Sequence, residues 1–159
     1  MIISDSGPII SFARANALSL LKRVVKKLII PQAVYKEIVL DGKGKPGEKE
    51  VKAGIWISRE PIEDATQLAS LPSNLGAGEK EAILLAQERS AFLLIDEYTP
   101  RKEAVRRGIR LISSVDILQE AKDRYLIPEV KGLLDEFIHT GFRLSRKLYR
   151  DILKRGGEY

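Results

Sequence analysis

Short apolar segments that alternate with helical patterns constrain the fold of this chain most strongly. Four such segments are Ile2–Ser4, Leu28–Ile30, 91–95 and 109–113, and a shorter one lies around Ile55–Ile57. Segments this short and apolar on both sides are typical of strands whose two faces are buried. Strands that alternate with helices form parallel sheets between helix layers. The sequence therefore predicts an α/β fold: a three-layer α/β/α sandwich with a short-stranded, mainly parallel central sheet.

Length and composition limit both the number of domains and the chemistry. The 159 residues, 44% of them hydrophobic, predict a single domain over residues 1–159. The chain has no cysteine and one histidine, His139, which excludes a cysteine-based zinc site or thiol nucleophile. A metal ion would therefore be held by oxygen ligands, which favours Mg²⁺ or Mn²⁺ as the cofactor.

The sequence also predicts where the protein works and what charge its partner carries. No apolar run reaches the ~18 residues of a membrane-spanning helix, and the N-terminal segment lacks the basic start of an export signal. We therefore expect a cytoplasmic protein with no membrane association. The net charge of +5 favours an anionic partner, although many soluble proteins without such a partner carry the same charge.

Two aspartates directly follow predicted strands. Asp5 ends the first strand, and Asp96 ends the strand at 91–95. The carboxyl ends of parallel strands lie along one edge of a sheet, where open α/β folds bind their ligands. We therefore expect both carboxylates at that edge. The alternative is that each aspartate caps the helix that follows it.

Glu79 lies at the start of a predicted helix, on the helix face that carries the apolar residues Ala82 and Ile83. The same helical spacing predicts that Glu81 points away from the core. A carboxylate on an apolar face is costly unless it is paired or bound to a metal. Favourable placement near the helix dipole is the alternative explanation.

Glu37 borders the apolar face of the helix predicted over 32–40, where a pair with Lys36 or Lys43 is the alternative. Together with Asp5, Glu79 and Asp96 it completes a set of four acids. Clustered carboxylates raise one another's pKa unless a cation lies between them. A divalent metal would offset this repulsion, activate a water molecule and stabilise charge on a phosphate.

Four segments in order along the chain resemble those of the PIN domain family: IISDSGPII, IPQAVYKEIV, GEKEAILLA and LLIDEYTPRKEA. The resemblance extends over nearly the whole chain, to small prokaryotic members with a DSxPLI-type start. It implies a PIN-like three-layer fold and a nuclease that cuts single-stranded RNA with Mg²⁺ or Mn²⁺. It also implies two protein partners, because many such proteins are toxins of toxin–antitoxin pairs and many form homodimers.

The resemblance assigns roles by position. It implies that Asp5, Glu37, Glu79 and Asp96 are the catalytic acids, and that Asp5, Glu79 and Asp96 bind the metal. Many toxin-type members have another aspartate three residues after the Asp96 position, where this chain has Thr99. Glu97 is the candidate to replace it as a metal ligand, and Asp116 is a further candidate.

Basic residues after the acidic pair suggest a surface for phosphates. We expect Arg101, Arg106 and the Ser6 hydroxyl to contact nucleic acid, whereas the basic residues near the C-terminus are more typical of a solvated helix face.

Other classes of protein fit the sequence less well. A PIN-like module that binds RNA or protein but cuts poorly is the main alternative, and a phospho-acceptor receiver domain is a third. The segment LGAGEKE lacks the third glycine of a dinucleotide-binding loop, which excludes that motif.

Overall fold

Five short strands form one fully parallel sheet in the computed structural model, which describes all 159 residues. The strand order is β3-β2-β1-β4-β5, so the direction of winding reverses between β1 and β4. The strands are β1 (Ile2–Ser4), β2 (Leu28–Ile30), β3 (Ile57–Arg59), β4 (Phe92–Leu94) and β5 (Leu111–Ile112). This arrangement confirms the predicted parallel α/β sheet.

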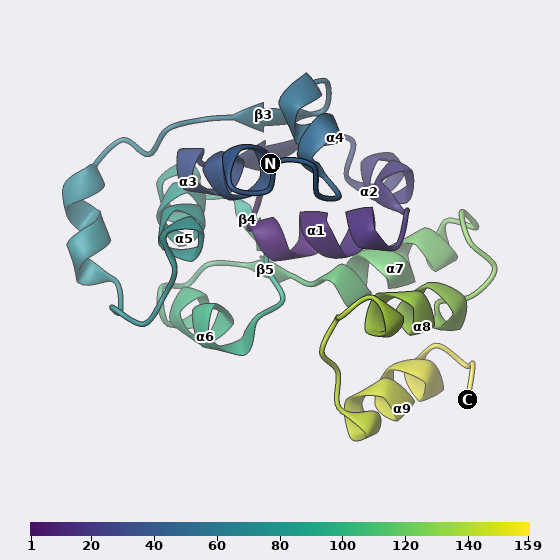
Figure 1. Cartoon of the computed structure of the whole chain (residues 1–159). Helices are drawn as coiled ribbons and strands as arrows, with labels where there is room; N and C mark the ends of the chain where they lie inside the picture. The colour runs from purple at the N-terminus through teal and green to yellow at the C-terminus, as the bar shows by residue number, and fades with distance from the viewer.

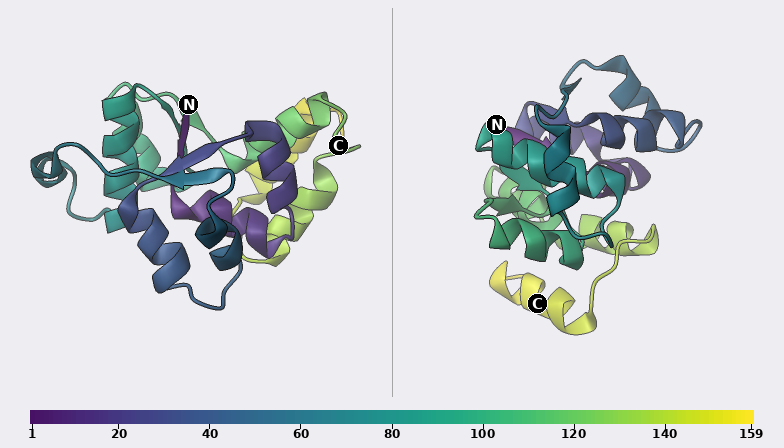
Figure 2. Two further views of the ribbon diagram at one scale, coloured as in Figure 1. Left: turned by 90° about the horizontal axis from the view of Figure 1, so that it is seen from above. Right: turned by 90° about the vertical axis from the view of Figure 1, so that its left-hand side faces the viewer.

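Helices connect the strands and cover both faces of the sheet (Figures 1 and 2). The α-helices are α1 (Ser6–Arg14), α2 (Leu18–Val25), α3 (Gln32–Tyr35), α4 (Glu48–Ala53), α5 (Ala77–Arg89), α6 (Tyr98–Arg106), α7 (Ser114–Asp123), α8 (Lys131–His139) and α9 (Arg146–Arg155). A π-helical turn, η1 (Lys36–Leu40), continues α3, and a 3₁₀-helix, η2 (Ala65–Ser70), precedes α5. None of these helices combines the length and the apolar character needed to cross a membrane.

Apolar side chains fill both sides of the sheet, as expected for strands that are buried on both faces. One core of 23 residues joins the sheet to helices that include α1, α2, α7 and α8. A second core of 11 residues lies mainly between the sheet and α5. The paired residues Ile3 and Leu93 both face the second core, whereas Leu94 faces the first. The two cores therefore account for the three layers.

Residues 9–24 carry apolar residues at helical spacing, but the structure divides this stretch into two helices. α1 ends at Arg14 and α2 begins at Leu18, with Asn16 between them at φ 55°. Asparagine tolerates this left-handed conformation better than most residues, so it permits a turn without glycine or proline. The break turns the chain between α1 and α2, both of which pack on the same core.

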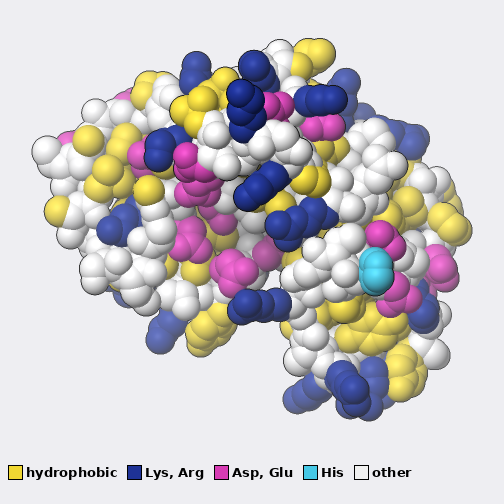
Figure 3. Space-filling model, viewed as in Figure 1, with side chains coloured by type: hydrophobic (Ala, Val, Ile, Leu, Met, Phe, Trp, Pro, Cys, Tyr) yellow, Lys and Arg dark blue, Asp and Glu magenta, His cyan; other side chains and the backbone are white.

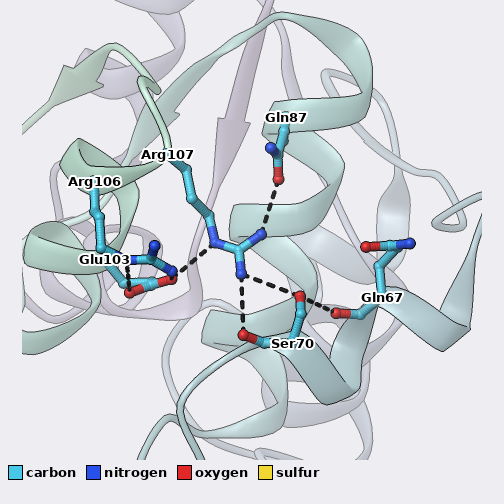
Figure 4. Close-up of polar contacts among 6 residues, drawn as sticks. All are labelled: Gln67, Ser70, Gln87, Glu103, Arg106 and Arg107. Atoms are coloured by element: carbon cyan, nitrogen blue, oxygen red, sulfur yellow. Dashed lines mark hydrogen bonds and ion pairs between the residues drawn. The ribbon is translucent and has the colours of Figure 1, made fainter.

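Glu103, a buried carboxylate on α6, is paired with two arginines at the end of that helix (Figure 4). Its oxygens accept hydrogen bonds from Arg106 Nε at 3.0 Å and from Arg107 Nε at 2.9 Å. The Arg107 guanidinium also donates to Gln87 Oε1 on α5 and to the backbone oxygen and hydroxyl of Ser70 in η2. Arg107 thus connects α6, α5 and η2.

This network predicts a pH dependence of stability. The hydrogen bonds from Arg106 and Arg107 lower the pKa of Glu103 from 4.5 to about 2. A lowered folded-state pKa adds stability that is fully present above pH 4.5 and is lost as the pH falls toward 2. We therefore expect the difference in unfolding free energy between wild type and Glu103→Gln to shrink over that range. Urea unfolding at several pH values measures it, and a difference independent of pH would contradict the assignment.

Candidate metal-binding site

Asp5 follows β1 and lies at the point where the winding of the sheet reverses. Its backbone N–H donates to Leu94 O of β4 at 3.0 Å, which fixes the residue against the neighbouring strand. The residue is only 5% exposed, and its side chain makes no capping hydrogen bond to α1. Its Oδ1 atom is buried and has no hydrogen-bond partner. Asp5 therefore makes no capping hydrogen bond to α1, although the backbone N–H groups of Ser6 and Gly7 lie close enough to its carboxylate to lower its pKa.

The surroundings of Asp5 disfavour its charged form. Burial and, to a smaller extent, the negative charges of Glu79 and Glu37 raise its pKa to about 7. The backbone N–H groups of Ser6 and Gly7 offset part of this effect. A buried carboxylate with an unpartnered oxygen and two like charges nearby is a favourable place for a cation.

Glu79 and Glu37 both hold the N-terminal end of α5. Glu79 Oε1 accepts the N–H of Gly76 at 2.8 Å, and Glu37 Oε1 accepts the N–H of Gly78 at 3.0 Å. Glu37 reaches Gly78 closely: a Cβ atom added at this glycine would lie 2.8 Å from Glu37 Cδ. Only glycine leaves room for the carboxylate in this position. Glu37 therefore pairs with the backbone of α5, and neither Lys36 nor Lys43 is its partner.

Glu81 is bound to a neighbouring helix, a contact that helical spacing along α5 did not predict. Its Oε1 atom accepts the N–H of Ala33 at 3.1 Å, at the start of α3. Spacing along α5 indicates which residues face its own core, but it gives no information about α3, which packs beside α5.

Asp96 follows the end of β4 and is held by the turn after β5. Its carboxylate accepts the backbone N–H of Ser114 at 2.7 Å and also the Ser114 hydroxyl. Burial raises the pKa of Asp96, and the nearby Glu97 adds to this, whereas the Ser114 hydrogen bonds and Arg101 counteract it. Asp96 therefore braces β4 against the start of α7, and the fully buried Ser114 fixes its orientation.

A cleft of about 580 Å³ opens above the two strand-end aspartates. It is lined by Asp5, Gly7, Ile10, Ser11, Arg14, Asp96, Glu97, Tyr98, Thr140, Gly141, Phe142 and Arg143. Figure 3 shows acidic side chains gathered around a central hollow of this face, with basic side chains beside them. The cleft lies at the carboxyl ends of the strands, where parallel α/β sheets bind ligands.

Of the other predicted site residues, one lines the cleft and three make contacts within the protein. Glu97 is exposed and lines the cleft, whereas Asp116 accepts the N–H of Ser113 at 2.8 Å and caps α7. Arg101 donates to Ile95 O, and Arg106 is paired with Glu103. Both guanidinium groups are thus engaged within the protein.

Two groups that shape this site could not be recognised from the sequence. Ser114 orients Asp96, and the segment 140–143 after α8 forms part of the cleft wall. A serine after a strand is too common to identify a partner for Asp96. The wall segment reaches the cleft only through the packing of α8 on α1.

The donor set fits a hard divalent cation, because every candidate ligand is a carboxylate oxygen. No group of three or more acidic or histidine side chains is arranged to hold a metal ion directly. Glu37, Glu79 and Asp96 each accept a backbone N–H, and Asp5 is the one of the four acids with a buried oxygen that has no hydrogen-bond partner. The arrangement therefore suits an ion bound directly at Asp5 that keeps several of its waters, as Mg²⁺ commonly does.

These features define a parallel α/β domain with a buried acidic site at its topological switch point. A family model described as a PIN domain matches residues 1–158, and the chain belongs to the PIN domain family, which places it in a nuclease superfamily. The resemblance seen in the sequence is thereby confirmed.

A structurally similar protein is a PilT N-terminus domain protein from the hyperthermophilic archaeon Sulfolobus solfataricus P2. It is 14% identical, with a TM-score of 0.48, and the match covers 91% of this chain and 98% of that one. No curated protein matches the chain.

Proposed function

We propose that this protein is a Mg²⁺- or Mn²⁺-dependent ribonuclease that hydrolyses phosphodiester bonds in single-stranded RNA. The buried Asp5 carboxylate, with its unpartnered oxygen at the base of an open cleft, carries the proposal. A divalent ion bound there would lower the pKa of a coordinated water and neutralise charge on the phosphate.

Four acidic residues of the protein would hold the ion in position and supply the negative charge that attracts it. Asp5 would bind the ion directly, and Asp96, held by Ser114, would contact it from the neighbouring strand. Glu79 and Glu37 are fixed at the start of α5 and add negative charge near Asp5. We propose that these two glutamates contact the ion through its waters.

A binding module that cuts poorly is the second candidate. Three of the four acids already accept hydrogen bonds from backbone N–H groups, and Thr99 replaces a common acid of related toxins. In that case the cleft would bind RNA without hydrolysing it.

Cleavage of a labelled single-stranded RNA with Mn²⁺, with Mg²⁺ and with EDTA separates the two candidates. We expect cleavage with either metal and none in EDTA. Asp5→Asn protein purified in parallel serves as the control for contaminating ribonuclease. Binding without metal-dependent cleavage would favour the binding module, and cleavage that persists in EDTA would contradict the proposed mechanism.

A further inference from the structure

Two arginines on the cleft have no partner within the protein. Arg14 ends α1, and Arg143 lies in the segment after α8; both are exposed and line the cleft. Neither makes an ion pair or donates a side-chain hydrogen bond, in contrast to Arg101 and Arg106. The two guanidinium groups are therefore available to an anion.

Arg14 contacts the cleft wall and lines more than one cavity. A Cβ atom added at Gly141 would lie 3.5 Å from Arg14 Nη1, so the segment after α8 packs directly against this guanidinium. Arg14 also lines a second cavity, of about 370 Å³, together with Glu37 and Lys45. Arg14 thus lines two cavities, one that includes Asp5 and one that includes Glu37.

Tyr98 supplies an aromatic surface to the same cleft. It is the first residue of α6, is 76% exposed, and its hydroxyl makes no hydrogen bond. A single exposed tyrosine is ordinary, but this one shares a cleft with two unpaired arginines. Unpaired bases stack on aromatic rings of this kind.

The charges in the cleft explain why arginines are needed there. Asp5, Asp96 and Glu97 line the same cleft and would repel a phosphate. Guanidinium groups bind phosphate with two parallel hydrogen bonds, which offsets this repulsion and fixes the position of the phosphate.

We infer that Arg14, Arg143 and Tyr98 form a nucleotide-binding subsite. Arg14 and Arg143 bind a phosphate of the strand, and the adjacent base stacks on Tyr98. This inference rests on the proposed function, because it identifies how that site holds its substrate. It also accounts for a preference for single strands, since a base paired in a duplex cannot stack on Tyr98.

Binding of a short fluorescent single-stranded RNA in EDTA tests the subsite without cleavage. We expect Tyr98→Ala to weaken binding roughly 10-fold and Tyr98→Phe to bind as wild type, because stacking needs the ring and not the hydroxyl. Arg14→Ala and Arg143→Ala should each weaken binding and reduce the salt slope, by no more than about 0.7, the value for one phosphate contact on a single strand.

Matched variants control for charge and aromaticity. Arg23 is exposed and unpaired and lies outside the cleft, and Tyr125 is 94% exposed. Arg23→Ala and Tyr125→Ala should bind as wild type. An abasic oligomer should lose affinity with Arg14→Ala but not with Tyr98→Ala, because it offers phosphates and no bases.

Three results would overturn the inference: equal binding by wild type and the cleft variants, equal losses in the control variants, or no RNA binding by wild type in EDTA. The proposed function fails separately, through the metal-dependent cleavage assay. Binding with this pattern but without cleavage would leave the subsite standing and reject the nuclease. Cleavage with unaltered binding by the cleft variants would reject the subsite alone.

Discussion

Replacing Gly78 with alanine is expected to remove most of the cleavage activity while leaving the fold intact. The new Cβ would lie 2.8 Å from Glu37 Cδ and Oε2, closer than such atoms approach. Because the end of a flexible glutamate is what stands in the way, the Glu37 carboxylate would move aside and lose its hydrogen bond to the Gly78 N–H. Displacing a residue that positions a metal site commonly lowers activity about 10–100-fold.

The fold should tolerate Gly78→Ala, because alanine favours a helix over glycine by up to about 1 kcal/mol. Gly76→Ala is the matched control: its Cβ would make an ordinary contact, 3.5 Å from Glu79 Oε1, at φ −71°. We expect Gly76→Ala to cleave as wild type. RNA cleavage rates, with thermal melting as the test of folding, measure both variants.

A double variant shows whether Gly78 acts through Glu37. If it does, Glu37→Ala combined with Gly78→Ala should cleave no more slowly than Glu37→Ala alone, because the displaced group is already absent. Losses that multiply would show that Gly78 matters for another reason and would contradict the positioning role.

Replacing Asp5 with asparagine is expected to abolish cleavage, by at least about 10³-fold, because metal ligands act at the chemical step. Binding of single-stranded RNA should be unchanged or tighter, since the substitution removes a negative charge from the cleft. Asp123→Asn is a matched control, because Asp123 is an exposed residue on α7 whose carboxylate accepts only from Gln119. Cleavage by Asp5→Asn at the wild-type rate would show that Asp5 is not a catalytic acid.

The strands and the two aspartates at their ends could be predicted from sequence because local signals specify them. Short apolar runs indicate buried strands, and the parallel arrangement then places Asp5 and Asp96 at one edge. Glu37 and Glu79 were also predicted near this site, and their charges do act on Asp5.

The partners of these acids could not be predicted, because they come from distant parts of the chain. Glu37 contacts Gly78, 41 residues away, and Glu81 contacts Ala33, 48 residues away. Periodicity along one helix gives no information about such contacts. The segment LGAGEKE does not fit a dinucleotide-binding loop, and the structure shows that its Gly78 makes room for the Glu37 carboxylate.

The arginines that are free to bind a phosphate could not be identified from the sequence either. Proximity in sequence to Asp96 suggested Arg101, yet its guanidinium donates to Ile95 O and stabilises the end of the strand segment. Arg14 and Arg143 are 129 residues apart in sequence and line the same cleft because α8 packs on α1. Which arginines are free to bind a phosphate depends on tertiary pairing that the sequence does not reveal.

Thermal melting with and without Mn²⁺, on wild type and Asp5→Asn, tests most directly whether Asp5 is the centre of a metal site. The pKa of Asp5 is raised to about 7, so its ionisation destabilises the metal-free protein as the pH rises through that value. At a pH above 7, Asp5→Asn should therefore melt at the same or a higher temperature than wild type in EDTA. Mn²⁺ at about 100 times its Kd should raise the wild-type melting temperature by roughly 5–10 °C and leave Asp5→Asn unchanged. An Asp5→Asn protein that keeps the Mn²⁺ response, or that melts far below wild type in EDTA, would contradict the account.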